Sequence, residues 1–146
     1  VITTTALFEK HEKNLAYAFN RKEAKDHGAA KGKVLVGAPI TAESRLVIVD
    51  DVITAGTAIR ETVELLKDFG PPKISGILIA MNRMEKNNDG VNALAELEET
   101  LGCPVRAIVD LDDVIEVLHG KEVDGQVYID DEQMEKIRAY RAEYGV

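Results

Sequence analysis

The stretch that decides the fold of this chain is Leu46-Val47-Ile48-Val49-Asp50-Asp51-Val52-Ile53-Thr54-Ala55-Gly56-Thr57. Its four leading apolar residues predict a strand that is buried on both faces, as strands of parallel sheets are. Two adjacent carboxylates follow where the apolar run stops. A loop of small residues then leads into a helical pattern from Ala58 to Phe69. The stretch therefore predicts a strand–loop–helix unit of an α/β fold.

The loop and the following helix N-terminus have the properties of an anion site. Backbone N–H groups in such a loop point inward, and the helix dipole favours negative charge. The two carboxylates by themselves would repel a phosphate. Beside this loop, however, they suit a ligand with a phosphate at one end and hydroxyls nearby. A ribose 5-phosphate has that shape.

Two other kinds of structure share parts of this pattern. A buried strand can end in a solvated acidic turn that binds nothing. The acidic pocket of a response-regulator receiver also follows a hydrophobic strand, but it needs a phospho-accepting Asp at the end of a later strand. Here Asp89 lies in the polar run Lys86-Asn87-Asn88-Asp89-Gly90, which is typical of a loop. We therefore favour the sugar-phosphate site.

The size and composition of the chain limit the function classes. With 146 residues, the chain fits one domain over residues 1–146 and can bury a core. The single Cys103 excludes an internal disulfide and favours the reducing cytoplasm. No apolar run approaches the roughly 18 residues of a membrane span. The net charge of −8 argues against nucleic-acid binding, and the scattered histidines suggest no zinc site.

One segment runs against this acidic background. Residues 21–33 contain five basic and two acidic side chains, a net charge of +3, which leaves −11 for the rest. A small polyanion would be drawn to this segment. It has no apolar face and contains Gly28 and Gly32, so we expect a mobile loop of more than ten residues, a kind of loop that often serves as a lid.

The stretch from Leu46 to Thr57 resembles the phosphoribosyl diphosphate (PRPP) signature of the type I phosphoribosyltransferases. The resemblance implies that Asp50 and Asp51 hold the ribose hydroxyls and that Thr54 to Thr57 wrap the 5-phosphate. The PRPP-binding residues that it implies in this stretch are Asp50, Asp51, Val52, Ile53, Thr54, Ala55, Gly56, Thr57 and Ala58.

The basic segment, F-N-R-K-E-A-K-D-H-G, is similar to the catalytic loop of the orotate phosphoribosyltransferases, one branch of that family. The resemblance implies that Arg21, Lys22, Lys25 and His27 close over the diphosphate of PRPP in the active site of a partner subunit. It thus implies a homodimer, with Arg21, Lys25 and His27 as catalytic residues.

The physical reasons for such a loop do not depend on the resemblance. Departure of diphosphate builds negative charge, while the ribose carbon becomes cationic. Cations that arrive on closure stabilise the leaving group and exclude water. With a reference pKa near 6.5, His27 can share a proton with the leaving group. A solvated charged loop is the alternative interpretation.

A second buried strand is predicted from Ile74 to Met81, and Asn82-Arg83-Met84-Glu85 follows it. Ligands of open α/β sheets bind at this end of the strands. The orotate enzymes have a D-R-Q-E-like sequence here, whose Arg contacts the orotate carboxylate. The resemblance therefore implies that role for Arg83, although Asn82 and Met84 depart from the pattern. An Arg that only caps the strand in solvent is the alternative.

The remaining elements follow from periodicity and turn residues. They are a helix within Val1–Lys13, strands at Leu15–Phe19, Val34–Gly37 and Val105–Val109, a helix at Val91–Leu101, a short helix capped by Asp110 or Asp112, a polar loop at Lys121–Gln126, and a last helix capped by Asp130 or Asp131. Strands that alternate with helices predict a three-layer α/β fold with a mostly parallel sheet. The resemblance implies the type I phosphoribosyltransferase core.

The resemblance implies a pentosyl transfer of pyrimidine biosynthesis. Phosphoribose would pass from PRPP to orotate, giving orotidine 5-monophosphate and diphosphate, with Mg²⁺ carried mainly by PRPP and no direct protein ligand. The family also has an N-terminal hood and a diphosphate loop, which would precede Thr3-Thr4-Thr5-Ala6, so we expect a truncated core with weak or no turnover alone. A non-catalytic PRPP-binding regulatory module and a transferase for another base are the alternatives.

Overall fold

The computed structural model describes residues 1–20, 35–54, 56–87 and 89–146 of the chain. These residues form two compact units, Val1–Ala42 and Glu43–Val146, each of which is described by itself. That residues 1–146 make up one domain stays a prediction.

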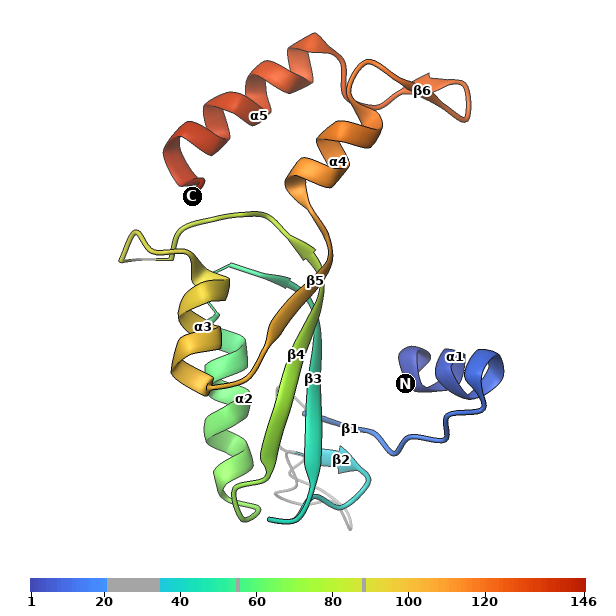
Figure 1. The fold of residues 1–146 in the computed structure, drawn as a ribbon, viewed down its shortest axis with the longest axis vertical. Coiled ribbons are helices and arrows are strands. Elements are labelled where there is room, and N and C mark those ends of the chain that lie inside the picture. The colour runs from blue at the N-terminus through green and yellow to red at the C-terminus, as the bar shows by residue number, and fades with distance from the viewer. Residues whose placement is uncertain (21–34, 55, 88) are drawn as a thin grey trace, which may run out of the picture. The chain divides into compact units, whose positions relative to one another are not determined.

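The larger unit is built on a parallel sheet with the strand order β3-β4-β5 (Figure 1). Its strands are β3 (Arg45–Ile53), β4 (Lys73–Asn82) and β5 (Val105–Asp110). Helix α2 (Thr57–Lys67) connects β3 to β4, and α3 (Ala93–Leu101) connects β4 to β5. Figure 1 shows both helices on the same side of the sheet. The predicted α/β fold with a parallel sheet is thus confirmed.

The core lies between the sheet and these two helices. Its buried members are Ile53, Ile59, Ile77, Ile79, Leu97, Cys103 and Val105. The alternation of side chains along a strand sends one set of residues to this core and the other set to the opposite face. The core is therefore made by every second residue of each strand and by the apolar stripe of each helix.

The prediction that β3 is buried on both faces is wrong. Burial alternates along the strand, and Val47 and Val49 are 60% and 53% exposed. Ile108 of β5 is likewise 69% exposed. The reason is that α2 and α3 both cover the other face (Figure 1). Strand β3 also continues past its apolar run to Ile53, so the paired acids lie within it.

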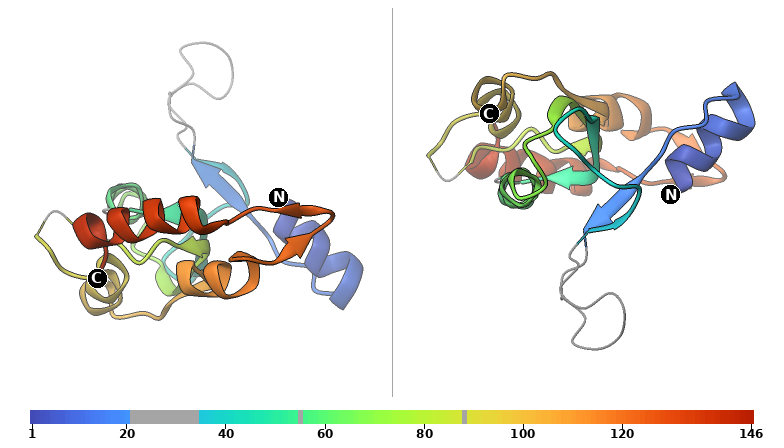
Figure 2. Two further views of the ribbon diagram at one scale, coloured as in Figure 1. Left: turned by 90° about the horizontal axis from the view of Figure 1, so that it is seen from above. Right: turned by 90° about the horizontal axis from the view of Figure 1, so that it is seen from below.

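The C-terminal part begins with α4 (Leu111–Leu118), whose N-cap is Asp110 in a capping box with Asp113. Where a polar loop was predicted, β6 (Glu122–Val123) and β7 (Gln126–Val127) form a short antiparallel hairpin. Helix α5 (Asp131–Tyr144) follows, capped by Asp130. An ion pair of 2.5 Å between Arg141 and Asp112 joins α5 to α4, which run side by side in Figure 2.

The smaller unit contains α1 (Ile2–His11) and a two-stranded antiparallel sheet. The strands are β1 (Ala18–Asn20) and β2 (Leu35–Gly37), so the two predicted strands exist with shifted bounds. Across the described ranges, no helix combines the length and the apolar character that crossing a membrane would need.

One-sided burial of the sheet predicts unequal costs for the same substitution on its two faces. Ile79 is 0% exposed on the helix-covered face, so Ile79→Ala should lower the free energy of unfolding by about 2–5 kcal/mol. Ile108→Ala on the exposed face is the matched control and should cost less than about 1 kcal/mol. Urea denaturation measures both. Equal losses would contradict one-sided burial.

Candidate functional site

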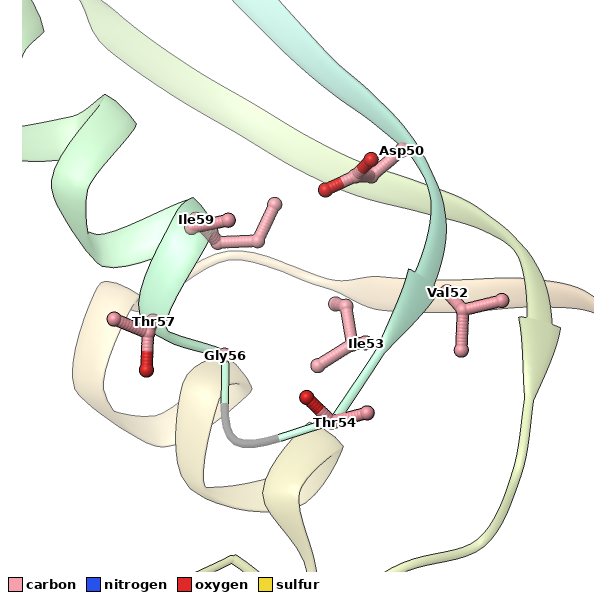
Figure 3. A pocket seen from close by; sticks show the side chains of 8 residues that line it. Asp50, Val52, Ile53, Thr54, Gly56, Thr57 and Ile59 are labelled. Atoms are coloured by element: carbon pink, nitrogen blue, oxygen red, sulfur yellow. The ribbon is translucent and has the colours of Figure 1, made fainter. Parts of the chain in front are cut away.

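The end of β3, the loop after it and the first turn of α2 surround a pocket of about 230 Å³ (Figure 3). The residues that line it are Asp50, Val52, Ile53, Thr54, Gly56, Thr57, Ala58 and Ile59. Figure 3 shows Asp50 on the strand that faces α2, and Thr54 and Thr57 on either side of Gly56. The strand, the loop and the helix each contribute one wall.

Gly56 is the N-cap of α2 and has left-handed backbone angles, φ 72° and ψ 9°. A Cβ at this position would lie 2.8 Å from Leu97 Cδ1 and 3.3 Å from an Arg60 guanidinium nitrogen. Both the backbone conformation and the lack of space therefore require glycine. As a result, the helix N-terminus sits directly against the core, and its first turn lines the pocket.

The pocket has a positively polarised wall and a negatively charged wall. The N–H groups of the first turn of a helix have no partner within the helix and carry the positive end of its dipole. In α2, every residue of which is described, the first turn has no acidic side chain to offset that charge. The opposite wall holds the Asp50 carboxylate. An anion fits the helix end, and a hydroxyl donor fits the carboxylate.

Among the predicted PRPP-binding residues, Asp51 is not one that lines the pocket. It follows Asp50 in β3, and alternation sends its side chain to the other face. Its backbone N–H donates to Asp50 Oδ1 at 3.0 Å, and its own Oδ1 accepts from the Val52 N–H at 2.7 Å. Ile59, which lies within the predicted helical pattern from Ala58 to Phe69 and was not predicted as a site residue, also lines the pocket.

An ion pair beside the loop was not predicted. Arg60 of α2 contacts Glu96 of α3 at 2.6 Å, and Asn87 Nδ2 donates to the other Glu96 oxygen at 2.7 Å. The hydrogen bond from Asn87, followed by that from Arg60, lowers the pKa of the Glu96 carboxyl below its usual value. The contact fixes the start of α2 to the start of α3.

Arg83 lies just beyond the carboxyl end of β4, and it faces a second pocket. That pocket is about 400 Å³ in volume and is lined by Met81, Arg83, Leu111, Lys136, Ile137 and Tyr140. In the sheet, Ile53 pairs with Asn82, so both pockets lie at the same edge of the larger unit. The structure thus brings Arg83 to the expected edge, but on a different pocket from Asp50.

Five predicted site residues lie outside the described residues: Arg21, Lys22, Lys25, His27 and Ala55. Within the described ranges, no group of three or more histidine, cysteine, aspartate or glutamate side chains is placed to hold a metal ion.

The geometry at Gly56 predicts that replacing this glycine destabilises the fold, and Gly102 is a control for the backbone part of the effect. Gly102 also has a left-handed backbone, φ 61°, but a Cβ there would meet nothing within 4 Å. Gly102→Ala should therefore cost only the backbone strain, about 1–2 kcal/mol. Gly56→Ala should cost at least about 1 kcal/mol more, because its methyl group collides with Leu97. Thermal or urea unfolding tests this, and equal costs would refute the close approach.

Comparison with known proteins assigns the fold to a family. The family description "Phosphoribosyl transferase domain" matches residues 5–95. The orotate phosphoribosyltransferase of Pseudomonas paraeruginosa is 44% identical over 144 residues, which cover 99% of this chain and 62% of that protein. That of Lachnoclostridium phytofermentans is 40% identical over 146 residues, covering 100% of this chain and 64% of the relative.

A crystal structure of orotate phosphoribosyltransferase from Francisella tularensis is also similar, with a TM-score of 0.71 and 28% identity over 98% of this chain and 62% of that one. The chain thus spans about 62% of the length of such relatives. The predicted resemblance is confirmed: the chain belongs to the phosphoribosyl transferase family and is similar along nearly its whole length to orotate phosphoribosyltransferases.

Proposed function

We propose that the protein carrying this chain transfers phosphoribose from PRPP to orotate, giving orotidine 5-monophosphate and diphosphate in pyrimidine biosynthesis. The observation that carries the proposal is the pocket between Asp50 and the first turn of α2. It pairs an amide-rich anion site with a carboxylate, in a chain whose relatives are named orotate phosphoribosyltransferases. No other base is named for those relatives.

The 5-phosphate of PRPP is proposed to lie at the loop from Thr54 to Thr57. Amides at a helix N-terminus bind phosphate without needing a basic side chain. Both Asp50 and Asp51 are proposed to meet the ribose hydroxyls, and Val52, Ile53 and Ala58 to complete the wall. Asp50 lines the pocket, so we expect it to contribute more than Asp51.

The diphosphate end of PRPP is proposed to meet Arg21, Lys22, Lys25 and His27, with catalytic roles for Arg21, Lys25 and His27. The support is the sequence F-N-R-K-E-A-K-D-H-G and its net positive charge in an acidic chain. Cations placed at the leaving group stabilise the charge that develops there. A homodimer, in which this segment serves the neighbouring subunit, is part of the proposal, as is a cytoplasmic location, which the single Cys103 favours.

Arg83 is proposed to bind the orotate carboxylate, because it stands at the same sheet edge as the sugar-phosphate pocket. Mg²⁺ is proposed to be held by PRPP. Bound there, it would neutralise charge on the diphosphate.

A coupled assay with orotate, uracil and hypoxanthine tests the proposed substrate. We expect turnover with orotate only, since uracil and hypoxanthine lack the carboxylate that Arg83 would bind. In the same assay, Lys25→Ala should lower kcat by at least about 100-fold, the lower end of what one charge-stabilising group contributes. Calorimetry should still detect PRPP binding. Preference for another base would sink the orotate assignment, and PRPP binding without any turnover would favour a regulatory module.

Two neighbouring substitutions test the sugar site. Asp50→Asn removes the charge that lines the pocket and should weaken PRPP binding about 10–100-fold, as expected for a lost hydrogen bond to a charged group. Asp51→Asn, a matched change one residue away, should weaken it less. Calorimetric titration with PRPP measures both affinities. A larger loss for the Asp51 variant would contradict the proposed division of roles.

A further inference from the structure

Three side chains form a closed group at the carboxyl end of β4. Arg83 Nη2 lies 2.6 Å from Glu85 Oε1 and donates to the Tyr140 hydroxyl at 2.5 Å. The Tyr140 hydroxyl in turn donates to Glu85 Oε1 at 2.5 Å. Each member therefore contacts the other two. Arg83, the residue proposed to bind the orotate carboxylate, is therefore contacted by both Glu85 and Tyr140.

The low exposure of Glu85 means that its carboxylate depends on the other two side chains of this group. Its side chain is only 10% exposed, so its charge needs partners inside the protein. Arg83 supplies the opposite charge and Tyr140 supplies a neutral donor. The same pairing raises the pKa of the Tyr140 hydroxyl, chiefly through its hydrogen bond to Glu85. A carboxylate held in this way keeps the guanidinium beside it.

The orientation of the guanidinium is also restrained. Its central carbon lies 5.6 Å from the centroid of the Tyr140 ring, within cation–π range. Within the part of the chain that the structure describes, both polar contacts of the Arg83 guanidinium are made by Nη2. A guanidinium has five N–H donors, so Nη1 and Nε retain donors for a ligand. An arginine with its plane fixed loses less conformational freedom when it binds a carboxylate.

The backbone ties α5 to the same place. The Lys86 N–H donates to the Tyr144 carbonyl at 2.8 Å, and the Val146 N–H donates to the Met84 carbonyl at 3.0 Å. Met84 itself has a left-handed backbone, φ 58°, and its N–H donates to Asn82 Oδ1 at 2.9 Å. This turn and the end of α5 thus hold one another, and Tyr140 reaches Arg83 from a fixed helix.

We propose that Glu85 and Tyr140 are positioning residues that hold Arg83 ready for the carboxylate of the base, so that the C-terminal helix α5 is part of the base site. The inference rests on the proposed function, which gives Arg83 its ligand. It assigns to Tyr140 a role beyond packing, and it explains why the Glu85 side chain, only 10% exposed, is a carboxylate.

The first test is kinetic and is made in the protein that carries this chain. Tyr140→Phe removes the hydroxyl but keeps the ring, and Glu85→Gln removes the charge but keeps the shape. Each should raise the KM for orotate about tenfold, with kcat and the KM for PRPP changed less than about twofold. Tyr144→Phe is the control, because it removes a hydroxyl from the same helix, and its kinetics should match the wild type.

The second test does not depend on activity. A double-mutant cycle in urea denaturation combines Arg83→Met with Tyr140→Phe, and a control cycle combines Arg83→Met with Tyr144→Phe. The first pair should show a coupling of at least about threefold in the unfolding equilibrium constant, and the control pair should show none. A coupled pair together with a raised KM for orotate supports the proposal.

Other outcomes overturn it. Absence of coupling between Arg83 and Tyr140 contradicts the group itself. Coupling with an unchanged KM for the base shows a structural contact without a positioning role. If the wild-type protein used uracil or hypoxanthine instead of orotate, the proposed function would fail, and the role of Glu85 and Tyr140 in holding Arg83 for a carboxylate would fail with it. Orotate turnover with an unchanged KM in both variants would instead contradict the positioning role alone.

Discussion

The close approach of Gly56 to Leu97 is the contact on which the rest of the larger unit depends. Leu97 is 0% exposed and sits where α2, α3 and the sheet meet. A residue without a side chain at position 56 lets the first turn of α2 rest on it. Because the helix starts so near the core, its first turn forms one wall of the pocket at the end of β3. The pocket follows from that packing.

Parallel pairing of β3 with β4 then brings the turn that contains Arg83 to the same edge of the sheet as the pocket. Ile53 of β3 is level with Asn82 of β4, and Asn82 is level with Asp110 of β5. The loops after these strands must therefore lie side by side, as they do in open α/β sheets that bind ligands at this edge. The acidic end of β3, the Arg83 turn and the start of α4 share one neighbourhood for that reason. These three segments are far apart in the sequence, and the strand register shows that they are neighbours in the fold.

The sequence predicted what depends on neighbours along the chain. The strand through Leu46–Val49, the small-residue loop and the helix after it were all found, because a local pattern determines each. The burial of β3 was predicted wrongly, because no local pattern shows that α2 and α3 cover the same face (Figure 1). The β6–β7 hairpin could have been predicted from Asp124-Gly125, a pair typical of tight hairpin turns, although the segment was predicted as a polar loop. Both residues have positive φ in the structure.

The side-chain pairs of the site could not be predicted from the sequence, for a different reason. Arg60 and Glu96 are far apart in the chain, and so are Arg83 and Tyr140, yet each pair is in contact. Tyr140 occupies a helix position that suggests packing, and its hydroxyl shows its partners only in three dimensions. Arg83 was located because it follows a strand, whereas its fixed orientation depends on the tertiary contact with α5.

The central claim is that the turn after β3 binds a sugar phosphate through backbone amides. Amide chemical shifts of ¹⁵N-labelled protein, recorded during titration with ribose 5-phosphate, test it most directly. The account predicts saturable shifts at Gly56 and Thr57, larger than those of the amides of α5. Shifts confined to other parts of the chain, or none at saturating ligand, would contradict it.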